Sequence, residues 1–278
     1  MPWECGWLNR QIQICSNTMS NTPITETSLA IDSTSYQVGN YGYTAINPAD
    51  LTNSEYTLVT ICVDTSSSVE NFKNNIEKFL ELVVAACRKC ATSENLLFRV
   101  VTFDTHVGNE IHGFRSLSQI KDTDYDNRIM TGGSTALFDA LSEAINTSVN
   151  YAGQLTATGC AVNCVIYLPT DGQNNSSSKN PVMVRDELVK ARRSEQVDSI
   201  NVVLIGLIDP NSKNLDANGL DPYLSDVKTE LGIDQYIFVG KATPQNLAKL
   251  AGFVSQSVSS MSSVIGSNAP IAVAAPTF

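Results

Sequence analysis

The chain has 278 residues and a formal net charge of -10, with 18 basic and 28 acidic side chains. This length suits one large α/β domain or a domain with extensions. The acidic balance and the lack of a Lys/Arg cluster argue against nucleic acid or an anionic membrane as a partner. No apolar run approaches the roughly 18 residues of a membrane span, and the first residues do not have the pattern of a secretory signal.

The seven cysteines predict buried, reduced thiols rather than zinc ligands. Cys62 falls inside an apolar run, and Cys87 lies on the apolar side of a predicted helix. Cys87 with Cys90, and Cys160 with Cys164, do not form the two exposed and correctly spaced pairs that a zinc site needs. Reduced thiols are typical of the cytosol, so we expect a cytoplasmic protein.

Residues 1–54 are rich in Ser, Thr, Asn and Gln and predict a polar N-terminal arm, either flexible or docked on a neighbouring surface. From Tyr56 onward, short β-branched and apolar runs alternate with segments in which apolar residues recur every three to four positions. The predicted strands are 57–63, 96–103, 161–168, 200–207 and 236–240. The predicted helices are 69–90, a segment from 137, one that starts at Pro181, 222–231 and one from Thr243 to about Val258.

Strands that alternate with helices predict an α/β fold with a doubly wound, mostly parallel sheet flanked by helices. Residues 107–114 could add a short antiparallel strand at one edge. The central domain is predicted at 55–260 and a Ser/Ala/Pro-rich C-terminal tail at 261–278. The terminal arms could link subunits into a homo- or hetero-oligomer.

Three turns of the predicted sheet carry oxygen-bearing side chains. Asp64, Ser66 and Ser68 follow the first strand, Thr135 follows a pair of glycines, and Asp171 follows a later strand. Each turn alone has an ordinary explanation as a helix start or a tight turn. Because parallel strands end at one edge of a sheet, however, the three turns are expected to converge. Two carboxylates and three hydroxyls suit a hard cation that keeps some water, Mg²⁺ or Mn²⁺.

The three motifs together resemble the metal-ion-dependent adhesion site of the von Willebrand factor type A family. They are D-x-S-x-S from Asp64, G-G-S-T-A-L from Gly132 and T-D-G from Thr170. The resemblance covers roughly residues 55–260 and implies a Rossmann-like fold with one short antiparallel edge strand. Because the family's adhesion-receptor insertions are lacking, the chain is closest in character to intracellular bacterial and phage members.

The resemblance also implies a role for each residue of the site. Ser66, Ser68 and Thr135 would be hydroxyl ligands, and Asp64 and Asp171 would bind the ion directly or through water. The remaining position would be filled by water or by a Glu or Asp of a protein partner. The sequence thus predicts a module for divalent-metal-dependent protein–protein interaction.

We expect no enzymatic activity. His106 and His112, the two histidines, lie in the predicted edge segment away from the three turns, and no G-x-S-x-G is present. A phosphatase of the haloacid dehalogenase type would have a second Asp where Ser66 stands, and Ala242 replaces the Ser/Thr of a phosphate-binding loop.

Two other interpretations stay open. The chain could be a structural subunit of a virion or another multi-subunit assembly, with the metal site joining one subunit to the next. It could also be an accessory to an AAA⁺ ATPase or to a stress-response system that resembles tellurite resistance.

Overall fold

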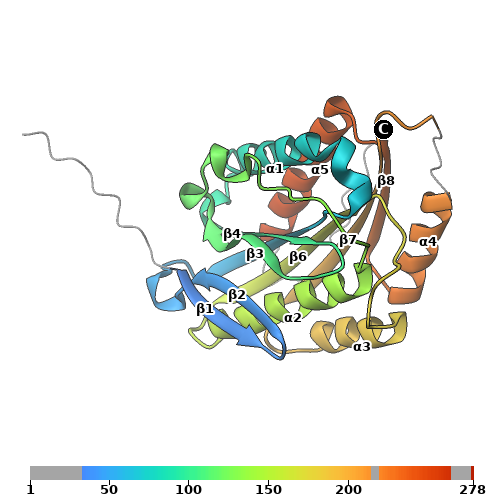
Figure 1. The fold of residues 1–278 in the computed structure, drawn as a ribbon. Helices are drawn as coiled ribbons and strands as arrows, with labels where there is room; N and C mark the ends of the chain where they lie inside the picture. Colours follow the sequence, from blue (N-terminus) through green and yellow to red (C-terminus); the bar gives the residue numbers. More distant parts are fainter. Residues whose placement is uncertain (1–32, 214–218, 264–276) are drawn as a thin grey trace, which may run out of the picture. The chain divides into compact units, whose positions relative to one another are not determined.

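The computed structural model describes residues 33–213, 219–263 and 277–278. These residues form one eight-stranded sheet in the order β1-β2-β5-β4-β3-β6-β7-β8, with helices on both faces (Figure 1). The strands are β1 Ser33–Val38, β2 Tyr41–Ile46, β3 Glu55–Asp64, β4 Leu96–Phe103, β5 Asn109–Ser116, β6 Ala161–Thr170, β7 Ser199–Ile208 and β8 Gln235–Lys241. The α-helices are α1 Lys73–Cys87, α2 Leu137–Thr156, α3 Pro181–Arg192, α4 Leu220–Leu231 and α5 Pro244–Ser262.

The predicted α/β fold with a mostly parallel sheet is confirmed. β3 pairs in parallel with β4 and β6, and β7 and β8 continue the parallel order. β5, which covers most of the segment 107–114, is antiparallel to β4 as predicted. Within the described ranges, no helix is long and apolar enough to cross a membrane. The predicted arm up to residue 32 and the tail from 264 to 276 lie outside the described residues.

β3 lies at the centre of the sheet and is covered on both faces. α1 and α5 pack together on one face, and α2, α3 and α4 cover the other (Figure 1). Leu58 and Cys62 pack on the α2 side, while Val59 and Ile61 pack on the α1 side. Because both faces are buried, the strand consists mostly of apolar and β-branched residues without polar alternation.

The β1–β2 hairpin continues the sheet beyond β5. The sheet therefore begins before residue 55, where the sequence analysis placed the start of the domain. β1 and β2 are antiparallel over their whole length, and β2 meets β5 at Ala45 and Phe114. The rings of Tyr36 and Tyr43 stack on each other, and the Tyr151 hydroxyl of α2 donates to the Ile46 carbonyl at 2.8 Å. A few aromatic contacts thus fix a segment whose composition is mostly polar.

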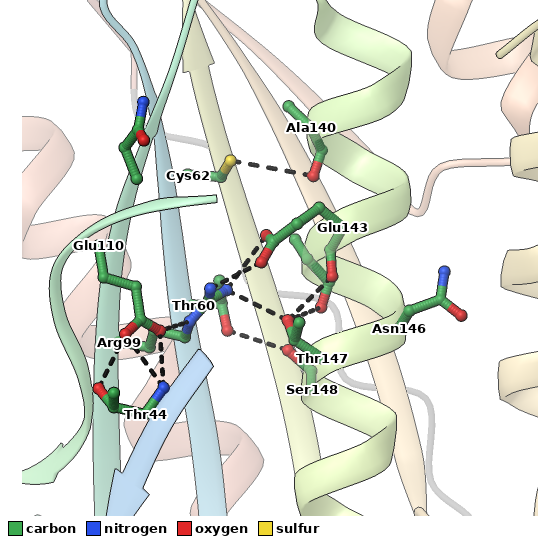
Figure 2. A network of polar contacts seen from close by, with 12 residues as sticks. Thr44, Thr60, Cys62, Arg99, Glu110, Ala140, Glu143, Asn146, Thr147 and Ser148 are labelled. Atoms are coloured by element: carbon green, nitrogen blue, oxygen red, sulfur yellow. Dashed lines mark hydrogen bonds and ion pairs between the residues drawn. The ribbon is translucent and has the colours of Figure 1, made fainter. Parts of the chain in front are cut away.

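A buried charge network joins the hairpin to the rest of the sheet (Figure 2). Arg99 of β4 is fully buried, and its Nη2 lies 2.6 Å from Glu143 Oε1 of α2. Its Nε lies 2.7 Å from Glu110 Oε1 of β5. Glu110 also accepts hydrogen bonds from the Thr44 backbone N–H and hydroxyl, at 3.0 and 2.8 Å. One guanidinium therefore links β4, β5 and α2 directly, and links β2 through Glu110.

Gly113 of β5 lies against the backbone of Thr44 in β2. A Cβ at this position would lie 1.9 Å from the Thr44 carbonyl oxygen, far inside contact distance. We expect Gly113→Ala to push the strands apart and to lower the free energy of unfolding by about 1–3 kcal/mol, measured by urea denaturation. Gly252→Ala on α5 is the matched control, because nothing lies within 4 Å of its Cβ. An equal change in the free energy of unfolding for the two variants would contradict this packing of the hairpin.

Candidate metal centre

Asp64, the last residue of β3, begins the first turn of the site. Its side chain is buried and held on both oxygens. Oδ1 accepts the Ser66 backbone N–H at 2.8 Å, and Oδ2 accepts the Thr170 hydroxyl at 2.5 Å. The Ser66 and Ser68 hydroxyls lie 3.1 Å apart. The turn thus fixes one carboxylate and gathers two hydroxyls beside it.

The glycine pair brings Thr135 to the same edge of the sheet. The Gly132 N–H donates to the Thr65 carbonyl at 2.9 Å, and the Gly133 carbonyl accepts the Ser67 hydroxyl at 3.0 Å. Gly133 has φ 67°, a left-handed conformation that favours glycine. These contacts tie the segment before α2 to the Asp64 turn, and Thr135 is buried there.

Asp171, the first residue after β6, completes the group. Its Oδ1 accepts the Ser68 hydroxyl at 2.8 Å. The next residue, Gly172, lies against Thr135, since a Cβ on Gly172 would be 2.9 Å from the Thr135 hydroxyl oxygen. The structure therefore brings together the five residues predicted from the sequence, from the ends of β3 and β6 and the start of α2.

The two carboxylates of this group have no paired basic side chain among the described residues. Burial raises the pKa of Asp64, although hydrogen bonds from Thr170 and Ser66 oppose the shift. Burial, followed by the charge of Asp64, raises the pKa of Asp171 to about 7. In the described part of the chain, neither carboxylate forms an ion pair with Lys, Arg or His. A bound cation would relieve this concentration of negative charge.

The donor set fits a hard divalent cation. The group offers carboxylate and hydroxyl oxygens, the ligand type that Mg²⁺ and Mn²⁺ prefer, and no thiolate or imidazole. Within the described ranges, no three His, Cys, Asp or Glu side chains form a group that could hold a metal ion. Metal binding at this edge therefore requires the hydroxyls as well as the two carboxylates.

A polar cavity of about 840 Å³ opens beside the group. Ser68, Thr135 and Asp171 line it on one side, so an ion at the group would be reached through this cavity. Most of the remaining lining consists of amide and hydroxyl side chains and one further carboxylate. These residues are Gln173, Asn174, Asn175, Asp209, Asn211 and Ser212.

A family model described as the von Willebrand factor type A domain matches residues 59–229. This segment is more than half of the chain and contains all five residues of the group. The chain belongs to the von Willebrand factor type A family. Domains of this family often mediate metal-dependent protein interactions. No curated protein matches the chain.

Solved structures with a similar fold have low sequence identity. The PilB minor pilin of Streptococcus sanguinis is 13% identical, with a TM-score of 0.53 over 80% of this chain and 65% of the pilin. The pilus adhesin SpaC of Lactobacillus rhamnosus GG is 11% identical, with a TM-score of 0.50 over 83% of this chain and 34% of the adhesin. Proximal thread matrix protein 1 of the mussel byssus, with a zinc-occupied site of this family, is 21% identical (TM-score 0.48, 73% and 46% covered). The chain spans less than two thirds of each of these proteins. The pilin and the pilus adhesin support the fold alone.

His112 lies in the predicted edge segment, and His106 directly precedes it. His112 is buried on β5, where Nε2 lies 2.9 Å from the Tyr125 hydroxyl and Nδ1 lies 2.9 Å from the Gly113 carbonyl. His106 is exposed, but its loop lies nearer to the site than predicted, because β4 ends at the same edge of the sheet as β3. The neighbouring Thr105 hydroxyl accepts the backbone N–H of Ser134, which directly precedes Thr135, at 2.9 Å.

Three supporting residues were not predicted to act at the site, although Thr170 belongs to one of its motifs. Thr170 bonds Asp64, Asn175 accepts the Thr135 backbone N–H at 2.8 Å, and Asp209 lines the cavity. Thr170 stands next to a predicted ligand and could have been found from that position. Asn175 lies in a polar loop without any pattern, and Asp209 follows β7 in a sequence that resembles an ordinary turn.

Proposed function

We propose that the chain is a divalent-metal-dependent protein-binding module. Mg²⁺ or Mn²⁺ would be held by an intact adhesion site of Asp64, Ser66, Ser68, Thr135 and Asp171, and would bind a Glu or Asp of a protein partner. The observation that carries the proposal is the convergence of two carboxylates and three hydroxyls beside an open cavity. Since three of the five donors are neutral, a bound ion keeps an attraction for another carboxylate.

The surface around the site favours a protein partner. Met130, shortly before the glycine pair, has 78% of its surface exposed. It does not sit on a loose segment, because the neighbouring Ile129 side chain is buried and the Ile129 N–H donates to Glu77 Oε1 at 3.0 Å. Large exposed apolar side chains near a polar site are typical of protein-binding surfaces.

We extend the proposal to a non-enzymatic protein inside the cell that binds neither nucleic acid nor membrane. The net charge of -10 supports the exclusion of these two anionic partners. The location is supported by the cysteines of the described residues, all of which are free. Three of these thiols, Cys62, Cys87 and Cys164, are buried, as in reduced intracellular proteins.

Affinity capture with the whole chain tests the function. An extract of the source cells is passed over immobilised wild type, Asp171→Asn and Asp226→Asn in Mg²⁺, and the columns are eluted with EDTA. Asp226 is exposed on α4 and does not line the cavity, so its variant controls for the lost charge. We expect one set of proteins on wild type and Asp226→Asn, released by EDTA, and none on Asp171→Asn. Capture that resists EDTA would contradict the proposal, and self-association that persists in EDTA would support a scaffold subunit instead.

Gly172 provides a test of the Thr135 ligand. The Cβ of Gly172→Ala would lie 2.9 Å from the Thr135 hydroxyl oxygen, so we expect this hydroxyl to be displaced. The expected result in calorimetry is an Mg²⁺ affinity lowered about tenfold, with little change in unfolding, because only a side-chain tip must move. Gly132→Ala is the matched control, because its Cβ would meet nothing within 4 Å. Equal Mg²⁺ affinities for the two variants would argue against Thr135 as a ligand.

A further inference from the structure

Asp209 places a fixed carboxylate in the cavity beside the proposed metal site. It directly follows β7 and lines the same cavity as Asp171. Its Oδ2 accepts the Asn71 side-chain N–H at 2.9 Å, and its Oδ1 accepts the Asn211 backbone N–H at 2.7 Å. Because these donors come from two different segments of the chain, they hold the carboxylate in one orientation.

No basic group of the described chain neutralises this carboxylate. Asp209 forms no ion pair with a Lys, Arg or His among the described residues. Among the described residues, those that line the cavity include no basic side chain. A ligand that enters the cavity would therefore meet an uncompensated negative charge.

A simple charge balance shows which ligand fits. Asp64 and Asp171 carry two negative charges when ionised, and a divalent ion balances them. A partner carboxylate on the ion adds one negative charge, and Asp209 adds another nearby. Like charges in a partly dehydrated cavity repel each other, and a cation supplied by the partner would remove the repulsion.

We propose that Asp209 selects partners that carry a Lys or Arg close to the Glu or Asp that binds the ion. This inference rests on the proposed metal-dependent function and specifies the chemistry of the partner. A partner segment with a Lys or Arg next to its acidic residue would bind. A segment with a cluster of acidic residues would bind weakly. Asp209 is thus a specificity-determining residue, because it discriminates between partners that share the ligating carboxylate.

Peptide display tests this selectivity without a known partner. Random 12-residue peptides on phage are selected on the immobilised full chain in Mg²⁺ and eluted with EDTA. We expect the eluted sequences to carry Lys or Arg within two positions of an Asp or Glu more often than the unselected library. Replacement of this base by alanine in a synthetic peptide should weaken binding to the wild type about threefold to tenfold.

The same peptide pair is then measured on Asp209→Asn, with Asp226→Asn as the control for net charge. Replacement of the base by alanine in the peptide should hardly change its affinity for Asp209→Asn. It should weaken binding to Asp226→Asn as much as binding to the wild type. A second variant, Asp209→Lys, should prefer peptides in which an acidic residue replaces the base. The role of Asp209 would be overturned if replacement of the base weakened peptide binding equally in all variants. It would also be overturned if the eluted sequences carried no base. A lack of EDTA-eluted sequences would instead overturn the metal-dependent function, and this inference with it.

Discussion

Arg99→Met is expected to lower the free energy of unfolding by about 3–5 kcal/mol, because it leaves a buried carboxylate without its partner. Glu143 is fully buried, and Arg99 is the cation that pairs with it. Glu110 would also lose an ion pair, although it is partly exposed and keeps its hydrogen bonds from Thr44. Urea denaturation followed by circular dichroism measures the loss.

The double variant Arg99→Met/Glu143→Met distinguishes an unpaired buried charge from lost packing. Its loss should be clearly smaller than the sum of the two single losses, since it removes the buried carboxylate together with its partner. Arg185→Met on α3 is the matched control. Arg185 is exposed, and its Nε lies 3.8 Å from Asp186 Oδ1 in a long surface ion pair. Its expected effect is below about 1 kcal/mol. Additive losses in the double variant would show that Arg99 and Glu143 are not energetically coupled, which would contradict the buried ion pair as the cause.

Asp171→Asn is expected to weaken Mg²⁺ binding by about 10- to 100-fold or more, since it removes one of two negative charges from the site. Calorimetry on the wild type should show one ion per chain, and saturating Mg²⁺ should raise the melting temperature. The variant keeps a side chain of the same size and an oxygen that can still accept the Ser68 hydroxyl. Its fold should therefore be unchanged.

Asp226→Asn again serves as the control, because it removes one exposed charge from α4. It should bind Mg²⁺ as the wild type does. An Mg²⁺ affinity of Asp171→Asn equal to that of the wild type would contradict the assignment of this residue as a metal ligand. Weaker binding in both variants would point to a diffuse effect of net charge instead.

The grouping of the five residues could be predicted from the sequence because its parts are local. Asp64, Ser66 and Ser68 occupy one turn, and a strand or a glycine pair precedes each of the other ligands. Parallel strands end at one edge of a sheet, so the order of elements suffices to bring the turns together. The five residues are now seen in one group, and their binding of a metal remains a prediction.

The charge network and the cavity could not be predicted in this way. Arg99 lies inside an apolar strand, and no periodicity shows that its partners are 11 and 44 positions away. Asp209 faces the site only because β7 lies next to β6 and ends at the same edge. These contacts depend on side chains that meet across the sheet, and such pairs leave no pattern in one sequence.

The sequence by itself determined the α/β fold and the element boundaries to within a few residues, since these follow from periodicity. The five residues of the candidate site were predicted from short motifs. Only the tertiary structure decided that residues 33–46 belong to the sheet, because a polar strand is held there by Gly113, aromatic contacts and Glu110 rather than by its own apolar pattern. It also decided the surroundings of the site, where Asp209 and the cavity arise from turns that the sequence keeps apart.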